Sequence, residues 1–171
     1  MKTIKNYRFI PAASFLMIIF LLSPSAIRAQ GKTDFSGKWT LNESKSELGD
    51  GNYRGGASRM TIQQQGNNLT IERVSQNRNG DEITTTEKIT LDGKESDNST
   101  DNRTRKSKAM WSADGKMLTI NTHMEFDRNG DTMSFDVVEI WKMQDSKTMV
   151  IDYTSTSSRG ERKRSFVYEK S

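Results

Sequence analysis

The amino-acid sequence predicts an all-β fold, an antiparallel up-and-down meander of about 8 to 10 strands closed into a small barrel. Apolar and polar residues alternate with a period of two through most of the chain, most clearly over residues 118–126, as in strands with one buried face. Turn-forming pairs such as Asn79-Gly80 and Asn129-Gly130 separate these runs at intervals of about 10 to 14 residues. Because no segment shows the periodicity of an amphipathic helix, the pattern favours a sheet protein.

The alternating runs define the strands in order. We expect about nine of them, at residues 36–42, 58–65, 68–77, 81–91, 103–112, 116–126, 131–143, 148–157 and 161–169. The longer connections, residues 43–57 and 94–102, are rich in Gly, Ser, Asn and Asp. Each Asn-Gly pair predicts a two-residue hairpin loop, because such a loop needs positive φ at both central positions.

One of the turn motifs is repeated. Arg-Asn-Gly-Asp occurs at residues 78–81 and again at residues 128–131, and a Leu-Thr-Ile triplet precedes each copy. Internal duplication and convergence of two hairpins on the same turn chemistry both explain the repeat. In either case it indicates hairpins.

Closure into a barrel is favoured because an open meander would leave two unpaired edges. An open, curved sheet is the alternative. Both prolines, Pro11 and Pro24, precede the first predicted strand, so every later backbone N–H is available for strand pairing. The chain has no cysteine, so stability must come from apolar burial and strand pairing without disulfides.

Residues 1–29 are predicted to be a secretory signal peptide, cleaved after Ala29. They combine a basic start that includes Lys2 and Lys5, an apolar stretch over residues 12–22 and a small-residue ending, the usual order in such signals. A membrane anchor is the alternative, but the stretch is about half the 20 residues that a spanning helix needs. We expect an exported protein, periplasmic or secreted, with no stable membrane insertion.

The predicted mature part, residues 30–171, should form a single domain. The chain has 26 basic and 22 acidic residues, and the signal holds four of the basic residues and no acidic one. The 26 basic residues less these four balance the 22 acidic ones, so the formal charge of the mature part is zero. We therefore expect no nucleic-acid partner, and we expect a monomer.

The first predicted strand carries a recognisable motif. Residues 35–41 read Phe-Ser-Gly-Lys-Trp-Thr-Leu, and this Gly-x-Trp opening resembles that of the lipocalin and fatty-acid-binding-protein superfamily. The chain looks most like the exported bacterial lipocalin-like proteins of that superfamily. The resemblance implies a lipocalin-like barrel in which Trp39 plugs one end and Gly37 allows close packing. Residues 166–170 also look like the terminal strand of fatty-acid-binding proteins.

Two features depart from fatty-acid-binding proteins. Residues 43–57 are too short and too rich in glycine to form their helical lid. Their carboxylate-binding Arg-x-Tyr pair would need arginine where Phe166 stands. Arg164, two residues earlier on the same strand face, could substitute as a polar anchor. The alternative is a solvated arginine within the basic run of residues 162–164.

Nothing in the sequence amounts to a catalytic site, and we expect no enzymatic activity, cofactor or metal. His123 is the single histidine and falls on the polar face of its strand, where we expect it to be exposed. No Gly-x-Ser-x-Gly elbow accompanies it. The basic run from Arg103 to Lys108 is interpreted as a charged edge or rim strand; a site for an anionic ligand or polymer is the alternative.

Two functions from different classes follow. The first is a non-catalytic protein that carries or scavenges a small hydrophobic or amphipathic ligand in the barrel interior. The second is an exported protein-interaction or inhibitor domain with a filled core, acting through its loops or rim. For the first, the alternation predicts these ligand-binding residues: Met60, Ile62, Leu69, Ile71, Trp111, Leu118, Ile120, Met124, Phe135, Tyr153 and Arg164.

Overall fold

The structure is a computed structural model that describes residues 31–49, 56–77, 79–128 and 130–171, and it confirms the all-β prediction. These residues form one short 3-10 helix, η1 (Glu43–Lys45), and ten strands. The strands are β1 (Gly37–Leu41), β2 (Arg59–Gln65), β3 (Asn68–Gln76), β4 (Glu82–Thr90), β5 (Glu95–Asp97), β6 (Arg103–Trp111), β7 (Met117–Arg128), β8 (Asp131–Met143), β9 (Thr148–Ser157) and β10 (Gly160–Lys170). The predicted signal peptide lies outside the described residues. Within them, no helix has the length and hydropathy needed to cross a membrane.

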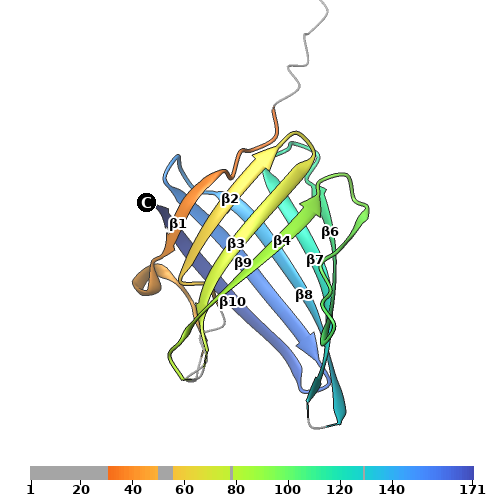
Figure 1. Ribbon diagram of the computed structural model, residues 1–171. Helices are drawn as coiled ribbons and strands as arrows, with labels where there is room; N and C mark the ends of the chain where they lie inside the picture. The colour runs from red at the N-terminus through yellow and green to blue at the C-terminus, as the bar shows by residue number, and fades with distance from the viewer. Residues whose placement is uncertain (1–30, 50–55, 78, 129) are drawn as a thin grey trace, which may run out of the picture.

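All ten strands belong to one antiparallel sheet (Figure 1). Its order is β4-β3-β2-β1-β10-β9-β8-β7-β6-β5, so successive strands pair with each other, as in a meander. Among the strands, one pairing joins elements far apart in the chain, that of β1 with β10, which sets Trp39 opposite Lys170 and Leu41 opposite Tyr168. This pairing brings the two ends of the domain together and closes the sheet into a barrel everywhere except between β4 and β5.

The break between β4 and β5 is bridged by side chains. The Asn98 side chain accepts a hydrogen bond from the Lys88 N–H at 2.8 Å and donates one to the Lys88 carbonyl at 2.9 Å. The Ser96 hydroxyl oxygen accepts from the Thr90 N–H at 2.9 Å. These side chains replace the strand partner that β4 lacks on this side. We call this contact the seam.

Strand β5 itself was not predicted. It lies within the connection expected over residues 94–102, and its three residues are too few for alternation to be detected. Its pairing with β6, which sets Ser96 opposite Ser107, positions the seam. Strand β5, the element that completes the barrel, therefore leaves no signal in the sequence.

The two Asn-Gly hairpins have different loops. Arg128 pairs with Asp131, so two residues connect β7 and β8, as predicted. Gly130 has a φ of +87° in this loop, and Asn129 lies outside the described residues.

Between β3 and β4 the prediction of a two-residue loop is wrong, because residues 77–81 connect the strands. The side-chain oxygen of Asn77 accepts hydrogen bonds from the backbone N–H groups of Asn79 and Asp81, at 2.8 and 2.9 Å. An asparagine that binds the backbone a few residues ahead stabilises a wider turn. The side chain of Asn77, and not the Asn-Gly pair, therefore determines the conformation of this loop.

Large aromatic side chains fill one end of the barrel, the end at which the segment before β1 lies, uppermost in Figure 1. Phe35 is completely buried, stacks on Trp111 with ring centroids 5.9 Å apart and meets Trp141 edge-on at 5.7 Å. Trp39 is also buried, and its indole N–H donates to the Phe35 carbonyl at 3.0 Å. The segment before β1 crosses this end, where the Thr33 N–H donates to the Gly115 carbonyl at 2.9 Å. We call this end of the barrel the closed end. The opposite end carries the β3–β4, β7–β8 and β9–β10 loops, and we call it the hairpin end.

Replacing Asn98 with alanine should weaken the seam. The variant loses both side-chain bonds to Lys88, so the free energy of unfolding should fall by about 1 to 2 kcal/mol. Hydrogen exchange at the Lys88 amide should become faster. Urea denaturation and exchange followed by NMR measure the two effects. Asn121→Ala, on the outer face of β7, is the control; an unchanged Lys88 exchange rate in Asn98→Ala would contradict this role of the seam.

Candidate functional site

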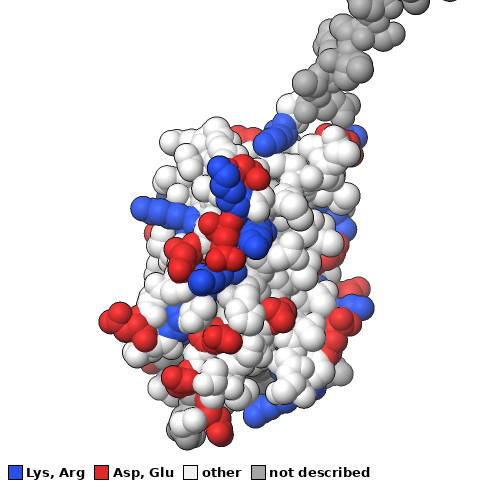
Figure 2. Space-filling view, turned by 90° about the vertical axis from the view of Figure 1, so that its right-hand side faces the viewer, with Lys and Arg blue, Asp and Glu red and all other residues white. Residues whose placement is uncertain are grey.

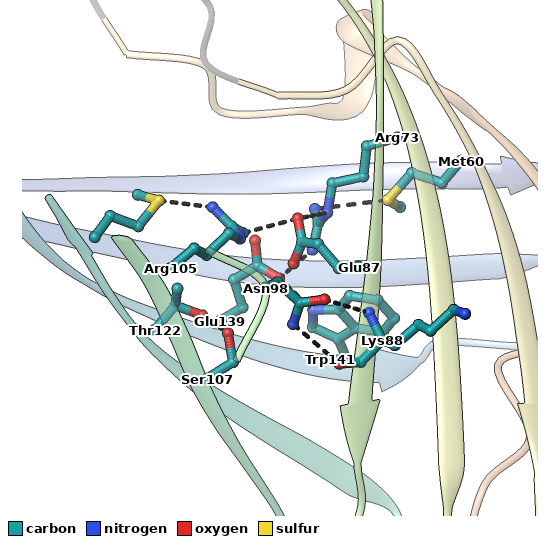
Figure 3. A network of polar contacts seen from close by, with 11 residues as sticks. Met60, Arg73, Glu87, Lys88, Asn98, Arg105, Ser107, Thr122, Glu139 and Trp141 are labelled. Atoms are coloured by element: carbon teal, nitrogen blue, oxygen red, sulfur yellow. Dashed lines mark hydrogen bonds and ion pairs between the residues drawn. The ribbon is translucent and has the colours of Figure 1, made fainter. Parts of the chain in front are cut away.

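Four charged side chains form a connected layer inside the barrel (Figure 3). They are Arg73 on β3, Glu87 on β4, Arg105 on β6 and Glu139 on β8. Strand pairing places Arg73 opposite Met60 and Glu139 opposite Ile120, and both of these apolar partners belong to the core. Because cross-strand partners share a face of the sheet, the register directs the charges inward. We call these four residues the ionic layer.

The ionic layer is a continuous chain of alternating charge. Arg73 Nη2 donates to Glu139 Oε2 at 2.7 Å, and Arg105 Nη2 lies 2.8 Å from Glu87 Oε1. Arg73 Nε lies 3.6 Å from the same Glu87 oxygen and links the two pairs. The four side chains are between 6% and 19% exposed. A buried charge without a partner costs several kcal/mol, so each member holds the others in place.

The ionic layer lies directly on the apolar core. The Trp141 indole N–H donates to Glu139 Oε2 at 2.9 Å, and the Arg73 guanidinium lies 5.6 Å from the Trp141 ring centroid. Burial alone would lower the pKa of Arg73, but the carboxylates of Glu139 and Glu87 outweigh it and raise that pKa above its usual range. Arg73 therefore stays charged at any ordinary pH.

The two arginines keep unused hydrogen-bond donors. The Nε atoms of Arg73 and Arg105 are buried and have no hydrogen-bond acceptor among the described residues. Arg105 Nη1 faces the sulfur of Met124, and a thioether is a weak acceptor. A guanidinium carries five N–H donors, so the two arginines do not fill their hydrogen-bonding capacity within the described residues.

Accessible apolar side chains lie between the ionic layer and the hairpin end. Met124, Phe126 and Phe135 are half-buried on the inner faces of β7 and β8, and the two phenylalanine rings stack with centroids 5.7 Å apart. Ile83 on the inner face of β4 is 46% exposed. These side chains therefore leave apolar surface exposed at the hairpin end.

The predicted ligand-binding residues separate into two groups. Six of them, Met60, Ile62, Leu69, Ile71, Leu118 and Ile120, belong to the core and are at most 2% exposed. A side chain with so little exposed surface contacts its neighbours and borders no space large enough for water. Trp111 packs against this core at the closed end.

The other four, Met124, Phe135, Tyr153 and Arg164, are half-buried. Tyr153 and Arg164 face each other across β9 and β10, and the Arg164 Nε donates to the Leu48 carbonyl at 2.9 Å. Arg164 is thus held by the segment that follows η1. It lies on the inner face of the sheet, because its partner Tyr153 pairs in turn with the inward Glu139. Binding by any of these residues stays a prediction.

Gly37 and Trp39 lie at the closed end. Gly37 has a φ of +143°, and the side chain of Lys170 covers it so closely that a Cβ would come within 2.7 Å of the Lys170 Cε. The Lys170 ammonium lies 5.3 Å from the Trp39 ring centroid. The two motif residues therefore pack against the end of β10.

Two hollows in the described part of the chain open on strand surfaces away from the ionic layer. One of about 410 Å³ is lined mainly by β6, β7 and β8, including Lys106, His123 and Val138. A second, of about 240 Å³, is bordered by Glu47 and residues of β9 and β10. Figure 2 shows the side of the molecule at the right of Figure 1, where basic and acidic side chains lie interspersed.

The outer face explains two further features of the sequence. The His123 side chain is 43% exposed on the outer face, and its Nδ1 lies 2.8 Å from Asp136 Oδ1. The basic run forms β6, one strand in from the edge strand β5, and it alternates: Lys106 and Lys108 point outward, near Glu95, while Arg105 points inward. The interpretation as a rim strand missed this inward arginine.

The fold and the ionic layer define a small antiparallel barrel with a filled closed end and a polar interior layer. No protein-family model matches the chain, and no curated protein matches it. Among solved structures, the chain is similar to the zebrafish ileal bile acid-binding protein complexed with cholic acid. The identity is 17% and the TM-score 0.49, over 80% of this chain and 98% of that one.

Replacing Arg73 with methionine should destabilise the protein strongly. The change leaves Glu139 buried without its cation, and breaking a buried ion pair typically costs about 3 to 5 kcal/mol. Urea denaturation measures the loss. Arg59→Met is the matched control, because Arg59 and Glu82 form an exposed pair of the kind that contributes less than about 1 kcal/mol. Equal losses in the two variants would contradict the stabilising role of the ionic layer.

The titration of His123 should report its outer-face contacts. Hydrogen bonds to Asp136 and Glu125 raise the pKa of His123 above its ordinary value. Because the folded-state pKa is the higher one, its contribution to stability is complete below a pH of about 6.5 and is lost as the pH rises through the folded-state pKa. NMR titration of this single histidine should show the raised pKa, and Asp136→Asn should lower it. A pKa that Asp136→Asn leaves unchanged would refute the contact.

Proposed function

We propose that this protein is a non-catalytic binding protein that carries or scavenges a small amphipathic molecule at the hairpin end of its barrel. The observation that carries the proposal is that exposed apolar side chains lie beside an arginine donor with a weak acceptor. Phe126, Phe135 and Ile83 supply the apolar walls, and Arg105 Nη1, which faces the Met124 sulfur, supplies the donor. Small-molecule sites commonly combine apolar walls with a few polar groups that fix orientation.

The energetics of such a site favour a ligand with an apolar body. Each Å² of apolar surface removed from water contributes about 25 cal/mol, and the half-buried side chains of Met124, Phe126 and Phe135 still have surface to cover. The flexible Met124 side chain can adapt to different shapes. A ligand oxygen that replaces its sulfur at Arg105 would provide a better acceptor than a thioether.

A binding role is also favoured over catalysis by the organisation of the charges. The carboxylates of the ionic layer are occupied by arginines, and His123 lies on the outer face of the barrel. The proposal extends to export into the periplasm or the medium, which the signal-peptide pattern of residues 1–29 supports. The Gly-x-Trp opening supports a place among exported lipocalin-like proteins.

A second candidate function is a protein-interaction domain. The hollow of about 410 Å³ on the outer faces of β6 to β8 favours it, because a partner could occupy this groove between Lys106 and Val138. The filled core at the closed end is compatible with both functions. The two candidates place binding on opposite faces of β8, since Phe135 points inward and Val138 outward.

Binding of an uncharged environment-sensitive dye, Nile red, tests the proposal. We expect saturable fluorescence enhancement that Phe135→Ala weakens at least about fivefold, because the variant removes most of an aromatic wall. Val138→Ala, on the outer face of the same strand, should leave dye affinity within about twofold. Far-ultraviolet circular dichroism checks that both variants fold.

The opposite pattern, with loss only in Val138→Ala, would favour the outer groove. Absence of saturable binding by the folded wild-type protein would overturn the proposal. Native mass spectrometry of protein purified from its own host provides an independent readout, since a carrier should retain a small molecule.

A further inference from the structure

Met124 lies where the ionic layer meets the accessible part of the barrel. It pairs with Arg105 on β6 and with Phe135 on β8, and its side chain is half-buried on the inner face. Its sulfur faces the Arg105 Nη1 donor, whereas Arg105 Nη2 lies 2.8 Å from a carboxylate oxygen of Glu87. One side of this guanidinium is therefore fixed by an ion pair, while another meets a weak acceptor.

The weak acceptor is also the group that an oxidant can change. The chain has no cysteine, so its sulfur chemistry is that of thioethers, which hydrogen peroxide converts to sulfoxides. The sulfur lone pair attacks one peroxide oxygen and the O–O bond breaks. The attacked oxygen stays on the sulfur, and its proton passes to the other oxygen, which leaves as water. The sulfur loses two electrons and the peroxide gains them.

Oxidation of Met124 would give Arg105 a stronger acceptor, because a sulfoxide carries a polar oxygen where a thioether has only its sulfur. The Nη1 donor already faces this sulfur, so an oxygen bound to it lies within reach of the same N–H group. Met124 is half-buried and has a flexible, unbranched side chain, so it can shift toward the hairpin end to admit the oxygen. The ion pair of Arg105 with Glu87 stays intact.

Two other methionines show what is particular to Met124. The Met60 sulfur lies 3.7 Å from Arg73 Nη1, in an equivalent contact, but Met60 is 2% exposed, so peroxide reaches it only through local opening of the fold. Met110 is 53% exposed, but it alternates with the inward Trp111 on β6 and so lies on the outer face. Met124 combines access from solvent with an arginine donor at its sulfur.

We propose that Met124 is a site of reversible oxidation by peroxides, at which Arg105 holds the sulfoxide oxygen. On the basis of the binding function proposed above, oxidation also weakens ligand binding. It makes polar a part of the wall that lies next to Phe135, and a polar wall gains less from covering the apolar surface of a ligand. The hairpin end then releases its ligand under oxidising conditions and recovers when the sulfoxide is reduced.

Mass spectrometry of the folded wild-type protein tests the site itself. After timed exposure to hydrogen peroxide, digestion gives the oxidised fraction of each methionine. Met124 should be oxidised at least about tenfold faster than Met60, which must wait for local opening, and the exposed Met110 shows that the oxidant is active. Oxidation of Met124 no faster than that of Met60, while Met110 reacts, would overturn the proposal.

Nile red affinity tests the effect on binding, with each protein compared with itself before exposure to peroxide and after its removal. The wild-type protein and the outer-face variant Met110→Leu should both lose at least about fivefold in affinity, because both form the sulfoxide at position 124. The ratio for Met124→Leu should stay within about twofold, because leucine has no sulfur to oxidise. Treatment with methionine sulfoxide reductase should restore the wild-type affinity. Met124→Ile serves if Met124→Leu does not fold.

Met124→Gln tests the contact with Arg105, because the amide oxygen of glutamine takes the place of the sulfoxide oxygen. Its urea midpoint should equal or exceed that of Met124→Leu, since the amide oxygen accepts a hydrogen bond from Arg105. At Met133, which pairs with Phe126, the same comparison should favour leucine. A lower midpoint for Met124→Gln than for Met124→Leu would contradict the contact.

The outcomes separate the inference from the function on which it rests. If peroxide lowers the dye affinity of Met124→Leu as much as that of the wild-type protein, another residue is responsible, and control of binding by Met124 is overturned while the carrier function stands. If the unoxidised wild-type protein does not bind the dye, the carrier function fails and the effect on binding fails with it. The mass spectra need no ligand and decide the oxidation site in either case.

Discussion

The pairing of β1 with β10 is the interaction on which the rest of the structure depends. Each other pair in the sheet joins strands that are neighbours in the chain, and these hairpins could form without a barrel. The β1–β10 pair, with Trp39 opposite Lys170, converts the meander into a closed surface with an inside and an outside. Once it forms, every second side chain enters a space of low dielectric constant, where the cost of each polar group depends on its partners.

The ionic layer is the costly consequence of that closure. Replacing a buried ion network by apolar side chains is often neutral or stabilising, so Arg73, Glu87, Arg105 and Glu139 are poorly explained by stability alone. Their arrangement also connects parts of the barrel that no backbone ladder joins. The pair of Arg105 with Glu87 at 2.8 Å links β6 to β4 across the seam from the inside, while Asn98 links the same region through Lys88. The layer therefore serves both the closure of the barrel and the chemistry of its interior.

Most of the fold could be predicted from the sequence because strand periodicity and turn chemistry are local properties. Nine of the ten strands leave an alternating pattern, whereas β5 is too short to show one. The site was harder to predict. Glu87 and Glu139 occupy inward positions between apolar neighbours, and the alternation in the sequence indicates this direction. The pairing of each carboxylate with a particular arginine, however, depends on strands that lie far apart in the sequence. Arg105 lay in a basic run, where its inward direction could be inferred only from the register of β6.

The position of the ionic layer along the barrel limits what the interior can hold. Between this layer and the closed end, side chains such as Leu69 and Leu118 are completely buried, and this half supplies apolar burial to a protein that has no disulfide. Under the proposed function, a ligand cannot extend in that direction without displacing the core. Its polar group would lie against the arginines, with its apolar part directed toward Phe126 and Phe135 at the hairpin end. This orientation would leave the far end of a long chain near solvent, which limits the apolar area buried and favours release, as the proposed carrier function requires.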